Sequence, residues 1–164
     1  MAATSWDPTG PKVVPRNGAE AYVAYGISEA NSQSFKAGQL VYNSSGAKLY
    51  PGGDAPVLGI AMKDATNTSS GNIEIPIQII TPEDTVIFGI ATSADVLQTP
   101  TSASLAVGTS YDTNAAASTA TYIDATDTTN PCFRYQGPVL DATGAETNYG
   151  YFRLLPAEAQ AWEG

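Results

Sequence analysis

Residues that could carry out acid–base chemistry or bind a transition metal are few in this chain of 164 residues. The sequence contains no histidine, which removes the commonest general base and the commonest transition-metal ligand. The one cysteine, Cys132, lies between Pro131 and Phe133 without a neighbouring base, so we interpret it as a buried structural thiol. Serine–histidine, cysteine–histidine and zinc sites of the usual kinds are excluded, and so is a disulfide within the chain.

Carboxylates are the remaining candidates for catalysis. Glu83 and Asp84 are adjacent in an expected turn, and Glu74 lies on the polar face of an expected strand. An acid–base pair of the glycosidase type is formally available from them. Their flanks contain nothing that would bury them and raise a pKa, so we favour turn and surface roles.

Two loops were considered as binding sites for ions. Asp124, Asp127 and Asn130 offer hard oxygen ligands, but their spacing differs from that of an EF-hand loop, and a polar turn is favoured over calcium. Gly52 and Gly53 precede aspartate and alanine instead of the lysine and helix start of a phosphate-binding loop. We therefore predict no catalytic residue, no metal and no cofactor, and we expect that the protein is not an enzyme.

The charge of the chain argues against nucleic acid as a partner. The formal net charge is −9, and the seven basic residues are scattered along the sequence. A phosphate backbone is bound by lysines and arginines gathered on one face. No apolar stretch approaches the roughly 20 residues of a membrane span, and the N-terminus lacks the features of a signal peptide. We expect a protein made in the cytoplasm, and its weakly charged surface suits an extracellular or virion surface.

Short β-branched and aromatic segments separated by glycine and proline turns predict an all-β fold. We expect a small β barrel, tulip-like fold or sandwich formed by one domain, residues 19–164, with a short helix at 157–162. Gly59 predicts a bulge or a close backbone approach, and Pro76 predicts an edge strand or an outward-facing nitrogen. Residues 93–98 are expected to form a helical turn. Expected strands are 19–27, 39–42, 47–50, 57–62, 73–80, 85–91, 110–112, 120–123, 132–135, 139–140 and 149–155.

Residues 1–18 are rich in proline and glycine and predict an extended N-terminal arm. The arm also contains apolar groups that a linker would not need. Two interpretations stay open: a tail with incidental apolar residues, and an arm that docks on a neighbouring subunit by strand addition. In the second interpretation the contact residues are Trp6, Pro8, Pro11, Val13, Val14 and Pro15.

A weak internal repeat runs through the chain. Residues 37–42 (AGQLVY) correspond loosely to 107–112 (VGTSYD), and Pro56-Val57-Leu58 corresponds to Pro138-Val139-Leu140. Two related modules, 35–91 and 105–156, would explain these matches, although such short matches also arise by chance.

The pattern AGQLVY, turn, KLY, loop, PVLGIA, polar loop, NIEIPI within residues 37–80 resembles the β modules of head decoration (cement) proteins of tailed bacteriophages. The resemblance covers about a quarter of the chain. It implies a small β barrel or tulip-like fold, often a homotrimer, on the outer surface of the virion. There it would clamp neighbouring major capsid protein subunits, sometimes through an N-terminal arm. The role of residues 92–130 is left open: a second module, an outward-facing knob or an inserted loop.

The sequence therefore predicts a virion structural protein that stabilises a capsid. A carbohydrate- or receptor-binding module of a phage fibre or tail is the alternative, because the nine tyrosines and two tryptophans could stack on sugars. We favour core positions for most of these rings. A trimeric nucleotide hydrolase is disfavoured because the motifs of that family are missing.

Overall fold

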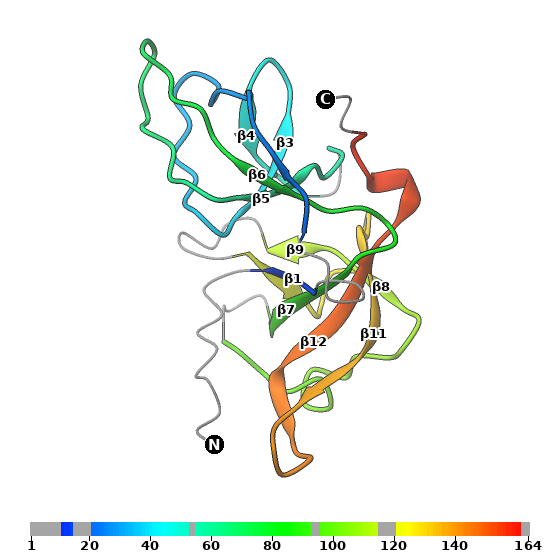
Figure 1. The fold of residues 1–164 in the computed structure, drawn as a ribbon. Helices are drawn as coiled ribbons and strands as arrows, with labels where there is room; N and C mark the ends of the chain where they lie inside the picture. Colours follow the sequence, from blue (N-terminus) through cyan, green and yellow to red (C-terminus); the bar gives the residue numbers. More distant parts are fainter. Residues whose placement is uncertain (1–10, 15–20, 53–54, 93–95, 115–120, 162–164) are drawn as a thin grey trace.

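The computed structural model describes residues 11–14, 21–52, 55–92, 96–114 and 121–161. Within them the chain forms strands, one short 3-10 turn and no α-helix, so the all-β prediction is confirmed. The strands build two barrel-like units, which Figure 1 shows one above the other. We call the unit of residues 21–80 barrel 1 and the unit of residues 85–155 barrel 2.

Barrel 1 is a five-stranded sheet in the order β2-β6-β5-β3-β4. A segment that continues from β2 joins the two ends of this sheet, because Ser28 pairs with Glu74 beyond β6 and Glu29 pairs in parallel with Ala47 of β4. The sheet therefore closes on itself. Its strands are β2 (Val23–Ala24), β3 (Leu40–Asn43), β4 (Ala47–Leu49), β5 (Gly59–Ala61) and β6 (Ile77–Ile79).

Barrel 2 follows the order β8-β11-β12-β7-β10-β9. The strands at the two ends, β8 and β9, are separated in sequence by Asp112 alone, so residues 110–114 cross from one edge of the sheet to the other and nearly close it. The strands are β7 (Thr85–Ala91), β8 (Ser110–Tyr111), β9 (Thr113–Asn114), β10 (Tyr122–Asp124), β11 (Phe133–Leu140) and β12 (Glu146–Leu154). The β11–β12 hairpin projects at the bottom of Figure 1.

The entry to β3 in barrel 1 and the entry to β8 in barrel 2 have the same backbone hydrogen bonds. Gly38 and Gly108 both have positive φ, at 92° and 88°, in the turns that lead into these strands. Each glycine N–H donates to the carbonyl of a residue on the neighbouring strand. The N–H of that neighbouring residue donates back to the carbonyl of the residue that follows the glycine. The partners are Ala61 and Gln39 in barrel 1, and Tyr135 and Thr109 in barrel 2.

The same correspondence continues around both barrels. Leu58 N donates to Val41 O as Cys132 N donates to Tyr111 O, and Ile80 N donates to Leu58 O as Leu155 N donates to Cys132 O. The parallel pairing of Glu29 with Ala47, which joins the two ends of the barrel 1 sheet, corresponds to Ile90 with Ile123 in barrel 2. The strands β2, β3, β4, β5 and β6 thus correspond to β7, β8–β9, β10, β11 and β12.

This register places one of the two sequence matches at equivalent positions. Residues 37–42 and 107–112 both enter the second strand of their barrel. Leu58, however, corresponds to Cys132, while Val139 lies in the outer part of β11, so the Pro-Val-Leu match is not structural. Because β7 pairs with β12 and β10, it belongs to barrel 2, and each repeat begins one strand earlier than the bounds 35–91 and 105–156 imply.

Both faces of the barrel 1 sheet are apolar where the barrels meet. Alternate residues such as Val41, Leu58 and Ile79 fill the interior of barrel 1, while their neighbours Leu40, Val57 and Ile80 join the core cluster of barrel 2. Strands buried on both faces read as continuous apolar runs, which explains the Leu-Val, Val-Leu and Ile-Ile pairs.

Two expected features of barrel 1 can be compared with the structure. A Cβ on Gly59 would lie 2.1 Å from the carbonyl oxygen of Gln78, so the predicted close backbone approach is confirmed. The edge position for the Pro76 strand is wrong, since β6 lies between β2 and β5. Proline is tolerated because it lies just before β6, where its carbonyl accepts a hydrogen bond from Met62 N.

Neither expected helical segment is helical in its described part. Leu97 pairs with Ala91, and Gln98 N donates to Ile90 O, so residues 96–98 follow β7 as extended chain. At the C-terminus a 3-10 turn, η1 (Pro156–Glu158), replaces the helix expected at 157–162. Ala159 then pairs in parallel with Val57 of barrel 1, so the chain returns from barrel 2 to the first barrel.

Candidate interaction surface

The described part of the arm forms β1 (Lys12–Val14), which pairs antiparallel with β7 of the same chain. Val13 is 4% exposed and belongs to the core of barrel 2, and Pro11 is also buried. Val14 is half-buried opposite Thr85. Trp6, Pro8 and Pro15 lie outside the described residues. Pro11 and Val13 are thus engaged within this chain, and the predicted capsid contact of the whole set stays a prediction.

β1 covers an edge that barrel 2 would otherwise leave open. One side of β7 pairs with β12. On the other side β10 pairs only with the end of β7, at Ile90 and Ala91. β1 fills the remaining length, with Lys12 opposite Ile87 and Val14 opposite Thr85. The start of β7 is therefore an interior strand because of the arm.

The equivalent edge of barrel 1 has no such cover in the described part of the chain. β2 is the terminal strand of its sheet and pairs only with β6. The carbonyl of Tyr22 accepts a hydrogen bond from Ile79 N of β6. Successive residues of an antiparallel strand direct their backbone groups to opposite sides, so the N–H and C=O of Val23 point away from β6. Those two groups have no strand beside them among the described residues.

Two tyrosines flank this edge with exposed rings. Tyr22 is 62% exposed and Tyr25 is 64% exposed. The blue segment that contains β2 lies across the front of barrel 1 in Figure 1. The edge is thus bordered by aromatic side chains, as contact surfaces are.

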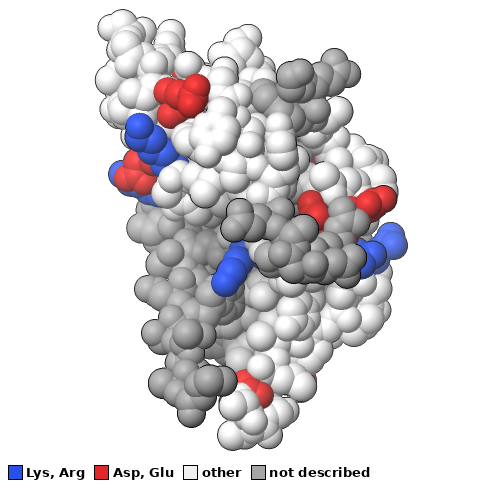
Figure 2. All heavy atoms as spheres, in the orientation of Figure 1, with Lys and Arg blue, Asp and Glu red and all other residues white. Residues whose placement is uncertain are grey.

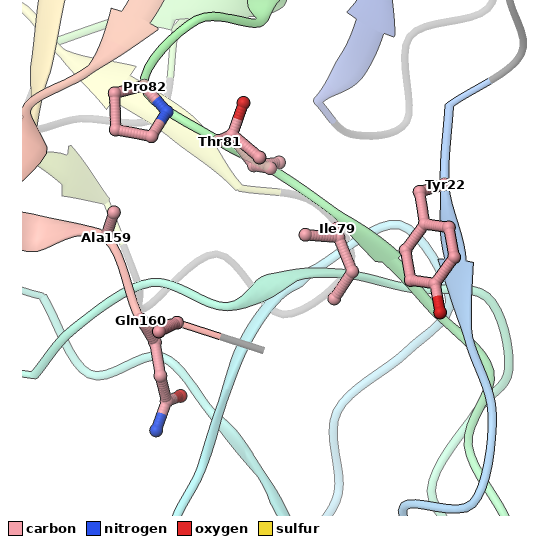
Figure 3. A pocket seen from close by; sticks show the side chains of 8 residues that line it. Tyr22, Ile79, Thr81, Pro82, Ala159 and Gln160 are labelled. Atoms are coloured by element: carbon pink, nitrogen blue, oxygen red, sulfur yellow. The ribbon is translucent and has the colours of Figure 1, made fainter. Parts of the chain in front are cut away.

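An apolar groove begins at Tyr22. It has a volume of about 640 Å³ and lies between the start of β2, the end of β6 and the segment after η1. Figure 3 shows Tyr22 on one side and Ala159 and Gln160 on the other, with Ile79 between them. We call the β2 edge, its two tyrosines and this groove the β2 surface.

The acidic residues considered for chemistry have structural partners. Asp84 accepts hydrogen bonds from the backbone and hydroxyl of Thr81, and Glu74 accepts one from Gly26 N. In the other loop Asp124 accepts from Thr126, and Asp127 accepts from Thr129 N. These are the turn bonds expected of short polar side chains, and no group of three or more His, Cys, Asp or Glu able to hold a metal occurs in the described ranges.

Glu29 is a buried carboxylate that no sequence pattern indicated. It is 2% exposed and accepts hydrogen bonds from the backbone and hydroxyl of Thr66 and from Ile73 N. Burial disfavours its charge, but these hydrogen bonds outweigh burial and hold its pKa below the usual value. Glu29 thereby fixes the long loop between β5 and β6, which is a structural role.

Cys132 lies in the barrel 2 core with no solvent exposure. Its Sγ donates to Oδ1 of Asp112 over 3.4 Å, and Asp112 also accepts from Thr113 N. Burial, together with the nearby charge of Asp112, raises the pKa of the thiol. The sulfur is therefore protonated and enclosed, and it supports the corner at which residues 110–114 cross the sheet.

The surface charges form no basic cluster on the face shown in Figure 2. Lys36 pairs with Asp64 at 3.3 Å, in the turn before β3. Among the described residues there is no helix with the length and hydropathy needed to cross a membrane.

Sequence reasoning missed Tyr22 and Tyr25 as surface residues, because aromatic rings were assigned mainly to the core. The missing information was the strand order: a tyrosine next to a terminal strand has no neighbouring strand to cover it. The available signal was Gly26, because glycine tolerates a positive φ, here 88°, and can end a regular strand directly after Tyr25.

With this geometry established, the chain was compared with known proteins. Neither protein-family models, nor curated proteins, nor solved structures gave a match.

Proposed function

We propose that this protein is a capsid decoration (cement) protein of a tailed bacteriophage. It would assemble in the host cytoplasm onto the outer surface of the head and stabilise contacts between major capsid protein subunits. The single observation that carries the proposal is the β2 surface: a strand edge without a neighbouring strand among the described residues, two exposed tyrosines beside it, and the apolar groove that Tyr22 lines.

The residues that carry the family resemblance support the same proposal. The segments AGQLVY, PVLGIA and NIEIPI contain or adjoin β3, β5 and β6, which are neighbours in the barrel 1 sheet. The resemblance thus concerns one contiguous piece of structure, in which β6 pairs with β2. A decoration protein needs complementary surface repeated over many sites, so modest individual contacts suffice through avidity.

The test is binding of the purified protein to expanded capsids, measured by co-sedimentation and by occupancy in electron micrographs. Replacement of both Tyr22 and Tyr25 by alanine should lower the affinity at least about tenfold, since interface aromatics each contribute about 1–2 kcal/mol. Leu140→Ala is the matched control, because Leu140 is 52% exposed but lies far along the β11–β12 hairpin. Equal occupancy for both variants would refute the assignment of the β2 surface.

A carbohydrate- or receptor-binding module is the second candidate, and the exposed rings of Tyr22 and Tyr25 are the observation that favours it. Exposed aromatic faces stack on sugars. Binding on a glycan array that is lost in the double tyrosine variant would support this candidate; an array without hits would remove it.

A further inference from the structure

The correspondence between the barrels identifies what kind of partner fits the β2 edge. Ala24 pairs with Ile77 as Val86 pairs with Phe152, so Val23, Ala24 and Tyr25 correspond to Thr85, Val86 and Ile87. In barrel 2 these three residues pair with β1, an extended antiparallel strand. Barrel 1 presents the corresponding backbone groups with no strand beside them among the described residues, so its edge suits the same kind of strand.

We propose that the β2 edge binds an extended strand from the N-terminal segment, residues 1–10, of a second copy of this chain. The strand adds antiparallel to Val23–Tyr25, as β1 adds to β7. The proposal deepens the proposed function, on which its biological meaning rests: it assigns the β2 edge to the contact between decoration subunits and leaves the two tyrosine rings and the groove for the capsid.

The direction of β1 indicates a second copy rather than the same molecule. β7 begins at Thr85, directly after the connection from barrel 1, and β1 runs antiparallel to it. The Val14 end of β1 therefore lies beside Thr85, while the Pro11 end points along β7 away from barrel 1. Residues that precede Pro11 thus start from the end of β1 that is farther from their own β2 edge.

The length and composition of the segment fit this role. Ten residues precede Pro11, and ten extended residues span up to about 33 Å. Three of them suffice for a ladder as long as β1, which leaves the others as a connection. Trp6 lies within the segment and adds an apolar aromatic residue to it.

An arm of one copy on the edge of the next is a head-to-tail contact, in which two different surfaces meet. Such contacts close into a ring if the rotation between copies allows it. A homotrimer, the assembly expected from the family resemblance, is one such ring. β1 stays on its own β7 in this arrangement, so no part of the described core has to open.

Two full-length variants separate the two halves of the contact. In the first, residues 2–10 are replaced by glycine and serine, which removes the donor strand and keeps β1. In the second, Val23→Pro removes the outward N–H and blocks the acceptor edge. Multi-angle light scattering should show an oligomer for the natural chain and a monomer for each variant, with self-association weakened at least about tenfold.

Mixing the two variants gives the decisive readout. The proline variant keeps its arm and the glycine–serine variant keeps its edge, so together they should form a 1:1 complex and nothing larger. A monomeric natural chain, an oligomer that either variant retains, or a mixture without a 1:1 complex would each overturn the proposal.

A peptide of residues 1–10 provides a test that does not depend on Val23→Pro folding. Added to the isotope-labelled glycine–serine variant, it should shift the amide resonances of Val23 and Tyr25 and slow their hydrogen exchange. Unchanged amides there would contradict the proposal. Capsid binding is measured separately: self-association without binding to capsids would disprove the proposed function and leave this contact standing.

Discussion

Barrel 1 and barrel 2 have the same strand order and register but are filled differently. Inside barrel 2 the equivalent positions hold larger side chains: Phe88 where barrel 1 has Ile27, Phe152 where it has Ile77, and Tyr135 where it has Ala61. Phe88 contacts both Phe133 and Phe152 edge to face. The difference shows that one hydrogen-bond pattern accepts two different cores, so the backbone register defines the barrel more strictly than its contents do.

The two barrels also differ in how they connect their last two strands. Barrel 2 extends β11 and β12 into a projecting hairpin, whereas barrel 1 has a polar loop at residues 63–72. The loop is held by Glu29, at the position that Ile90 occupies in barrel 2. A single carboxylate in barrel 1 therefore orders a segment that the second barrel orders by strand pairing.

The largest predicted losses of unfolding free energy come from substitutions in the interiors of the two barrels. Phe88→Ala removes a fully buried ring with two aromatic neighbours and should cost about 4 kcal/mol of unfolding free energy. Ile27→Ala, the equivalent change in barrel 1, should cost about 3 kcal/mol because a smaller cavity is left. Urea denaturation followed by circular dichroism measures both. A larger loss for Ile27→Ala would show that barrel 1 carries the more tightly packed core.

The second effect concerns Glu29. Glu29→Ala leaves the N–H groups of Thr66 and Ile73 without their carboxylate and should destabilise the protein by about 2–3 kcal/mol. Ile90→Ala at the equivalent position tests packing without hydrogen bonds. Hydrogen exchange distinguishes the two, since only the glutamate variant should expose the amides of residues 63–72.

Glu29 also predicts a pH dependence. Its pKa in the folded protein is lower than in the unfolded chain, so its contribution to stability is complete above the ordinary glutamate value of 4.5. The contribution is lost as the pH falls through the folded pKa. Glu29→Gln should therefore lose less stability than the natural protein as the pH falls below the ordinary glutamate value. Hydrogen bonds from neighbouring residues also lower the pKa of Asp64 and Asp141, so some acid sensitivity should remain in the variant.

The sequence predicts the features that depend on residues close together in the chain, and it does not predict those that depend on pairing between distant residues. Residues 85–91 were predicted as a strand with the observed bounds, because their β-branched run is local. Gly59 was interpreted correctly because a glycine inside a strand itself indicates a bulge or a close backbone approach, whichever residue is the neighbour. The closure of each barrel was not predictable, since Glu29 with Ala47 and Ile90 with Ile123 pair across long separations in sequence. The candidate surface was missed because exposure of Tyr22 and Tyr25 follows from strand order, which local patterns do not contain.

The third effect compares the two equivalent edges. Thr85→Pro removes an N–H that faces β1 and should cost about 2 kcal/mol, because β1 loses part of its ladder and Val13 loses part of its burial. Val23→Pro, at the equivalent position of barrel 1, should change the stability of the monomer by less than about 0.5 kcal/mol. Equal destabilisation of dilute monomers would show that the β2 edge already has a partner within the chain.

The smallest effect should arise where the end of the chain joins the barrels. Gln160 uses its side-chain amide in the way a strand uses its backbone: Oε1 accepts from Asn43 N at 2.7 Å and Nε2 donates to Asn43 O at 2.8 Å. Gln160→Ala should cost about 1 kcal/mol of unfolding free energy, since water can hydrate the backbone N–H and C=O of Asn43 in its place. Gln160→Glu keeps the acceptor and loses the donor, so its stability should fall between that of the natural protein and that of Gln160→Ala. Thermal unfolding measures the stability of all three proteins.

Gln160 and Ala159 also line the groove beside Tyr22. If Gln160→Ala weakens capsid binding by more free energy than it loses in stability, this end of the chain belongs to the contact surface.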